Sequence, residues 1–94
     1  MRILLVEDDT LVARGITLML KGANAVVDQT DTGEEAMELA RHYDYDIVLL
    51  DLMLPDMEGY EVVRRLRAAR LEVPVLIISG LSRPQAKVKG LSLD

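Results

Sequence analysis

Apolar runs and amphipathic segments alternate along the whole chain, and this alternation predicts four strands and four helices. Short apolar or β-branched runs predict the strands, at residues 3–6, 25–30, 46–51 and 73–79. Between and after them, apolar residues recur at the three- and four-residue spacing of a helix. These helices are expected over about 11–21, after Thr32, over about 60–70, and from Ser82 to about 91. The predicted element order is therefore βαβαβαβα.

Polar residues at the ends of the first two helices indicate where each of them begins or stops. Either Asp9 or Thr10 is expected to cap the first helix, and Gly22 is expected to end it. Thr32 and Glu35 have the spacing of a capping box, in which a hydroxyl is followed three residues later by a carboxylate. The inward face of the first helix is expected to carry Val12, Ile16, Met19 and Leu20.

The run at 46–51 is apolar without alternation, which is typical of a strand buried on both faces of a parallel sheet. The run at 73–79 reads in the same way. Strands that alternate with helices imply a doubly wound α/β fold, with right-handed crossovers and helices on both faces of the sheet. In such folds the functional groups gather beyond the carboxyl ends of the strands. We therefore expect the chemistry of this protein at that edge.

Composition narrows the class of protein further. The 94 residues suffice for one domain, and half of them are apolar. The net charge of −5 argues against direct binding of nucleic acid, which requires Lys and Arg to displace counterions from phosphates. The chain has no cysteine, so disulfides and thiolate metal sites are excluded. No apolar run is long enough to span a membrane or to serve as a signal peptide, and a cytoplasmic protein is expected.

Three of the predicted strands end in polar side chains at the expected functional edge. The first strand ends in Glu7 and Asp8, the third in Asp51 and the fourth in Ser79. If the first and third strands are neighbours, Asp8 and Asp51 lie side by side, and carboxylates that close repel unless a cation lies between them. A ligand set of oxygens without His or Cys favours a hard ion, and Mg²⁺ fits best.

An aspartate beside Mg²⁺ can attack phosphorus and form an acyl phosphate, which makes Asp51 a candidate nucleophile. Ser79 would offer a hydroxyl to a phosphoryl oxygen, and peptide N–H groups at 52–54 would donate to other oxygens. Each of these residues alone has an ordinary explanation, because aspartate and serine are common in turns and caps. Their joint arrangement at three strand ends favours the phosphoryl site.

With these residues identified, three stretches of the chain resemble the receiver domain of response regulators. They are RILLVEDD, YDYDIVLLDLMLPDMEGYEVVRRLR and VPVLIISG, and together they span nearly the whole chain. The stretch ELARHYDYDIVLLDLMLPDMEGYEVVRRLR also resembles the CtrA-type cell-cycle transcriptional regulators in particular. The resemblance implies a flavodoxin-like or CheY-like sheet with strand order 2-1-3-4-5.

The resemblance also implies a role for each matching residue in two-component signalling. Asp51 would accept a phosphoryl group from a histidine kinase or a histidine phosphotransfer protein. Asp8, Asp51 and the backbone carbonyl of Met53 would bind Mg²⁺, and Glu7 would act through a metal-bound water. Ser79 would contact the phosphoryl group and link phosphorylation to a conformational switch that controls transcription. Such a protein is a switch rather than an enzyme, with at most autophosphorylation and autodephosphorylation.

The chain departs from the receiver pattern at its carboxyl end. Receivers continue through a fifth strand, with a lysine and an aromatic switch residue, and a fifth helix, and we find no match to these before residue 94. Residues 1–94 are therefore expected to form a single receiver domain that is incomplete at its C-terminus. The fourth strand and the last helix would then be exposed. Two explanations follow: the chain pairs with a second copy through that face, or it is a truncated receiver.

Two other functions remain open at this point. A metal-dependent hydrolase with an aspartyl nucleophile typically needs a second acid two residues after the nucleophile, and Met53 stands there. A truncated or inactive receiver would act only as a protein-interaction module. The missing lysine favours that interpretation, and the retained Glu7, Asp8, Asp51 and Ser79 oppose it.

Overall fold

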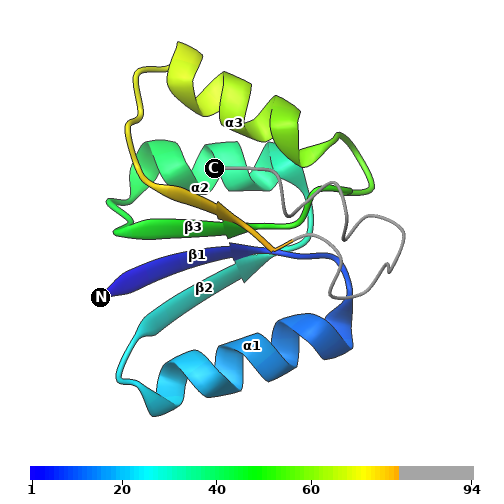
Figure 1. Cartoon of the computed structure of the whole chain (residues 1–94). Coiled ribbons are helices and arrows are strands. Elements are labelled where there is room, and N and C mark those ends of the chain that lie inside the picture. Colours follow the sequence, from blue (N-terminus) through cyan, green and yellow to red (C-terminus); the bar gives the residue numbers. More distant parts are fainter. Residues whose placement is uncertain (79–94) are drawn as a thin grey trace.

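The computed structural model of the chain describes residues 1–78, in which helices flank a four-stranded parallel sheet (Figure 1). In chain order the elements are β1 (Arg2–Val6), α1 (Thr10–Gly22), β2 (Val26–Thr30), α2 (Gly33–His42), β3 (Ile47–Leu50), α3 (Gly59–Ala68) and β4 (Val75–Ile77). The strands lie in the order β2-β1-β3-β4, and every neighbouring pair is parallel. The α/β fold and the strand order 2-1-3-4 expected from the sequence are confirmed.

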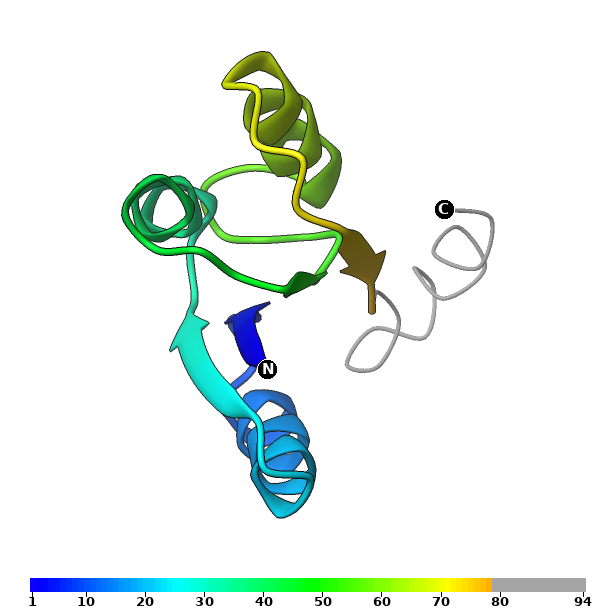
Figure 2. The same ribbon diagram turned by 90° about the vertical axis from the view of Figure 1, so that its left-hand side faces the viewer.

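The helices of residues 1–78 cover the two faces of the sheet unequally. Helix α1 lies alone on one face, and α2 and α3 lie together on the other (Figure 2). Alternate residues of β1 serve the two faces, because Leu4 packs on the α2 and α3 side while Ile3 and Leu5 pack on the α1 side. The central strands are therefore apolar over residues 3–6 of β1 and over Ile47–Leu50 of β3, as the apolar run at 46–51 indicated.

The structure decides between the two candidate caps of α1 and confirms that the helix ends at Gly22. Asp9 rather than Thr10 is the cap, because its Oδ1 accepts from the peptide nitrogens of Leu11 and Val12 at 3.0 and 3.1 Å. Gly22 is the last helical residue, and the left-handed conformation after the helix is adopted by Asn24 at φ 64°. The expectation that Met19 faces inward was wrong, since its side chain is 71% exposed.

The capping box at the start of α2 is half formed. The hydroxyl of Thr32 accepts from the peptide nitrogen of Glu35 at 3.2 Å, as expected. The carboxylate of Glu35 accepts instead from the hydroxyl of Thr30, a buried residue at the end of β2. Glu35 therefore ties α2 to the sheet as well as belonging to the first turn of its helix.

Strand β4 is shorter and less buried than the pattern at 73–79 predicts. It spans Val75–Ile77, and Leu76 on its α1 side is 53% exposed. Ser79 and the helix expected after Ser82 lie outside the described residues. Within residues 1–78, every helix is too short or too polar to cross a membrane.

Candidate functional site

The register of the parallel strands brings acidic residues from two segments together. In the β1–β3 ladder Val6 pairs with Leu50, so the residues that follow these strands, Glu7 and Asp51, lie next to each other. The peptide nitrogen of Asp51 donates to the carbonyl of Val6 at 2.9 Å, which continues the ladder to the edge of the site. Asp8 follows Glu7 directly. The expected neighbourhood of Asp8 and Asp51 thus arises from strand order and register.

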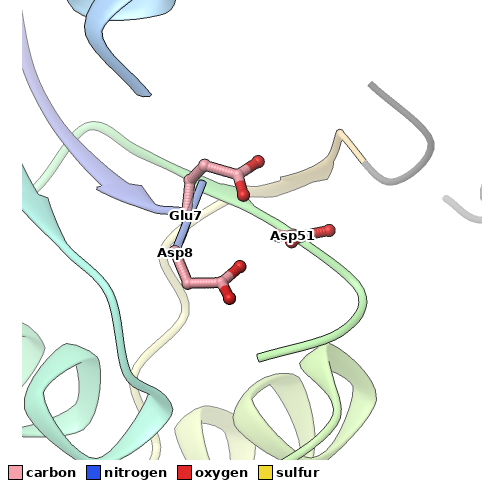
Figure 3. A group of neighbouring side chains, drawn as sticks. All are labelled: Glu7, Asp8 and Asp51. Carbon is pink, nitrogen blue, oxygen red and sulfur yellow. The ribbon is translucent and has the colours of Figure 1, made fainter. Parts of the chain in front are cut away.

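Glu7, Asp8 and Asp51 form a compact carboxylate cluster, called here the acidic cluster. One carboxylate oxygen from each residue lies within 4.8 Å of the corresponding oxygens of the other two. Figure 3 shows Glu7 and Asp8 on the segment after β1, with their carboxylates extending toward the side on which Asp51 lies. Glu7 and Asp51 are only 1% and 3% exposed, and Asp8 is partly exposed. Buried carboxylates this close together need compensation for their charge.

The pKa of Glu7 shows the effect of burial and of the neighbouring carboxylates in the acidic cluster. Burial raises the pKa of Glu7 to about 7, against the opposing effect of the peptide nitrogen of Asp9, which donates to its carboxylate at 3.0 Å. The negative charges of Asp51 and Asp8 raise this pKa further. Burial and the neighbouring carboxylates therefore disfavour the charged form of Glu7, and a bound cation would favour it.

The donor set of the acidic cluster fits a hard divalent cation. Its ligand atoms are carboxylate oxygens, the class that Mg²⁺ prefers, and thiolate and imidazole groups are absent from the cluster. Burial is the main cause that raises the pKa of Glu7, and the charges of Asp51 and Asp8 add a repulsion that such an ion would relieve. By the chemistry of its residues, this edge of the sheet is a candidate metal centre.

The segment after Asp51 folds back on itself as a tight loop, residues 51–59, called here the acceptor loop. The peptide nitrogen of Gly59 donates to the carbonyl of Leu52 at 2.5 Å, and that of Leu54 donates to the carbonyl of Met57 at 3.1 Å. Between these two bonds, Met53 forms an antiparallel bridge with Glu58, and its side chain is 47% exposed. Met53 is thus held close to Asp51 by backbone hydrogen bonds, while the predicted site residue Ser79 lies outside the described residues.

One residue at the site escaped the sequence reasoning. Gln29, the fourth residue of β2, donates from its side-chain amide to the backbone carbonyl of Glu7 at 2.9 Å. A second bond joins Glu7 to β2, because its peptide nitrogen donates to the carbonyl of Thr30 at 2.9 Å. The only sequence signal for Gln29 is its place one residue before the end of β2, and that gains meaning only when β2 is known to lie beside β1.

A cavity opens beside the acidic cluster along α1. Its volume is about 570 Å³, and Asp8, Gln29 and Asp31 line it together with residues of α1. The helix contributes the cations Arg14 and Lys21 and the apolar side chain of Leu18, which is 65% exposed. The edge of the sheet that carries the acidic cluster thus continues into a hollow of mixed charge, next to an exposed apolar side chain.

Comparison with known sequences gives matches to response regulators. The family model of the response regulator receiver domain matches residues 3–94. Among curated proteins, the cell cycle response regulator CtrA of Brucella ovis is 54% identical over 91 residues, which cover 97% of this chain and 39% of that protein. The chain therefore spans about two-fifths of the length of the curated relatives it matches.

Solved structures agree with the sequence comparison. The receiver domain of the Francisella response regulator 1452 is similar with a TM-score of 0.82 and 28% identity, covering 96% of this chain and 74% of that chain. The response regulator TrrA of Thermotoga maritima, solved in complex with Mg(2+)-BeF, has a TM-score of 0.81 and 25% identity. That match covers 99% of this chain and 81% of the TrrA chain.

Proposed function

Because the chain belongs to the response regulator receiver family, we propose that it accepts a phosphoryl group on Asp51 in the presence of Mg²⁺. The observation that carries this proposal is the acidic cluster, in which Glu7, Asp8 and Asp51 come within 4.8 Å of one another at the carboxyl ends of adjacent strands. In this role the chain is a phospho-accepting switch of two-component signalling rather than an enzyme.

The proposed reaction is a phosphoryl transfer from a phosphohistidine of the donor protein. A carboxylate oxygen of Asp51 attacks the phosphorus, and an O–P bond forms as the P–N bond to the imidazole breaks. The electron pair of the broken bond stays on the imidazole nitrogen, and Asp51 becomes an acyl phosphate. Because Asp51 is 3% exposed, its surroundings limit the access of bulk water to this hydrolysable group.

The other proposed roles of the site are the binding of Mg²⁺ and the orientation of Glu7. Asp8, Asp51 and the backbone carbonyl of Met53 would hold Mg²⁺ directly, and Glu7 would hold it through water. When bound, Mg²⁺ supplies positive charge that offsets the carboxylates and the charge of the transferred group. Glu7 is oriented from two sides, by the peptide nitrogen of Asp9 and by the contact of Gln29 with its backbone. The role of Ser79 in the switch stays a prediction.

The donor we propose is a histidine kinase or a histidine phosphotransfer protein that docks on α1. In support, the exposed face of α1 combines apolar Leu11 and Leu18 with the cations Arg14 and Lys21, next to the cavity that reaches Asp8. Such a face suits an amphipathic helix of a donor, with apolar contacts at its centre and charges that set its orientation.

We further propose that phosphorylation controls a transcriptional output, by the likeness to the cell cycle response regulator CtrA. The remaining sequence-based expectations concern the protein as a whole. Four of them stay predictions: a single receiver domain over residues 1–94, a homodimer through the fourth strand and last helix, the absence of direct nucleic-acid binding, and a cytoplasmic location.

The proposal is tested by the intact mass of the protein after incubation with acetyl phosphate, with Mg²⁺ and with a chelator. We expect a Mg²⁺-dependent gain of one phosphoryl group, which is lost in Asp51→Asn. A folded protein that gains no phosphoryl group would refute the proposal, and the interaction-module function would replace it.

A further inference from the structure

The acceptor loop is anchored at its tip to a second element, helix α2. The peptide nitrogen of Leu54 donates to the carbonyl of Met57, so Pro55 and Asp56 form the turn at the tip of the loop. The carboxylate of Asp56 accepts from the peptide nitrogens of Gly33 and Glu34, at 2.8 and 2.9 Å. These are the first two residues of α2. The tip of the loop therefore adds to the capping of α2, because it accepts from the two peptide nitrogens that Thr32 does not reach.

The two bonds to Asp56 are charge-assisted. Asp56 is exposed, and the desolvation that remains raises the pKa of its carboxyl. The hydrogen bonds from the peptide nitrogens of Gly33 and Glu34 outweigh this effect and hold the pKa below its usual value. The carboxylate also lies at the positive end of the α2 dipole. The carboxylate of Asp56 thus joins the acceptor loop to the N-terminus of α2 by two short, directional hydrogen bonds.

Packing makes the link between α2 and the acceptor loop rigid. A Cβ atom on Gly33 would lie 2.6 Å from both Cγ and Sδ of Met57 in the loop, so α2 touches the loop without space between them. At the other end of the loop, a Cβ atom on Gly59 would lie 2.5 Å from the carbonyl oxygen of Asp51. A continuous path of contacts therefore runs from the first turn of α2 to the backbone of the proposed phospho-acceptor.

We propose that Asp56 is a positioning residue for phosphoryl acceptance, because it fixes the tip of the acceptor loop on α2. Asp51 is fixed by the β1–β3 ladder, but Met53, the proposed carbonyl ligand, lies within the loop. A loop released at its tip would therefore no longer hold the carbonyl of Met53 in place relative to Asp51. This inference rests on the proposed function. Groups that orient metal ligands or reacting atoms from a distance typically contribute 10- to 100-fold to affinity or rate.

The matched control is Thr32, which caps the same turn of α2 through a hydrogen bond to α2 itself. Its hydroxyl accepts from the peptide nitrogen of Glu35 at 3.2 Å. Asp56→Ala and Thr32→Ala each remove a cap of α2, so both are expected to lower the urea midpoint of unfolding. Asp56→Asn keeps one acceptor oxygen and is expected to fall between Asp56→Ala and the wild type.

The experiment measures two properties of the folded proteins, the Mg²⁺ dissociation constant from amide chemical shifts and the rate of phosphoryl gain from acetyl phosphate. We expect Asp56→Ala to raise the dissociation constant by about 10-fold and to slow phosphoryl gain by a similar factor. Thr32→Ala should leave both unchanged, and Asp56→Asn should restore part of each loss.

The outcomes separate this inference from the proposed function. If the wild type gains a phosphoryl group and Asp56→Ala matches Thr32→Ala in both properties, Asp56 is only a helix cap and the inference fails. If the wild type gains no phosphoryl group, the proposed function fails, and the inference fails with it. Weaker Mg²⁺ binding in Asp56→Ala alone would then show only that Asp56 orders a metal site.

Discussion

Replacing Gly59 by alanine is expected to destabilise the protein, although alanine is the better helix former. Gly59 is the first residue of α3 and is buried against the start of the acceptor loop. A Cβ atom there would lie 2.5 Å from the carbonyl oxygen of Asp51 and 3.0 Å from Cα of Leu52. Both neighbours are backbone atoms, so no side-chain rotation can relieve the contact.

The size of the effect follows from a comparison with Gly15, in the middle of α1. A Cβ atom on Gly15 would meet no other atom within 4 Å, so Gly15→Ala should gain the full helix preference, about 1 kcal/mol. Gly59→Ala forces the backbone of the acceptor loop to shift, and overpacking of this kind costs about 1–3 kcal/mol. The two substitutions are chemically identical and should change the free energy of unfolding in opposite directions.

The assay is urea unfolding of both variants and the wild type, followed by circular dichroism. A Gly59→Ala variant as stable as the wild type would refute the close packing of α3 on the acceptor loop. The carbonyl that moves in Gly59→Ala belongs to Asp51, so this variant should also gain its phosphoryl group more slowly, whereas Gly15→Ala should react at the wild-type rate.

Further predictions address the charge, the polar contacts and the docking face of the protein. Mg²⁺ should raise the free energy of unfolding by about 1.4 kcal/mol for each tenfold excess over its dissociation constant, measured by urea unfolding, because it binds the folded state. Asp8→Asn should abolish this dependence and stabilise the metal-free protein by about 1 kcal/mol through relief of repulsion; a less stable variant contradicts the charge conflict. Tyr45→Phe removes the hydroxyl that donates to Asp28 at 2.7 Å and should cost about 1 kcal/mol at neutral pH. That hydroxyl is the main cause that lowers the pKa of Asp28, so its contribution is complete above the unfolded value of about 3.9 and disappears as the pH falls through the lower folded pKa. In urea unfolding, the difference between Tyr45→Phe and the wild type should therefore be smaller at pH 2 than at pH 6. Leu18→Glu should slow phosphoryl transfer from a phosphorylated histidine kinase and leave the reaction with acetyl phosphate unchanged; equal rates with both donors argue against docking on α1.

The sequence predicts the acidic cluster because its residues follow apolar strands directly. In a parallel sheet every strand points the same way, so residues at the ends of β1 and β3 meet at one edge whatever the loops do. Glu7, Asp8 and Asp51 are placed by this rule alone, and the confirmed strand order makes them neighbours. The position of β3 is also predictable from the sequence, because the run at 47–50 consists only of apolar residues, which favour burial on both faces of the sheet.

Other features depend on contacts that sequence spacing does not contain. Asp56 caps a helix that starts 23 residues earlier in the chain, and only the placement of α2 beside the acceptor loop reveals this. Glu35 has the correct spacing for a capping box, yet its carboxylate accepts from Thr30 because β2 ends beside it. Met19 lies at the margin of the apolar stripe of α1, where helical periodicity alone cannot separate contact with the sheet from exposure.

The most direct test of the central claim locates the phosphoryl group on the chain. After reaction with acetyl phosphate and Mg²⁺, borohydride reduces an aspartyl phosphate to homoserine, and peptide mass spectrometry identifies the converted residue. The account predicts homoserine at position 51, formed only when Mg²⁺ is present. Conversion at Asp8 or at another carboxylate, or conversion that is independent of Mg²⁺, would contradict the assignment of Asp51 as the acceptor within a metal-binding acidic cluster.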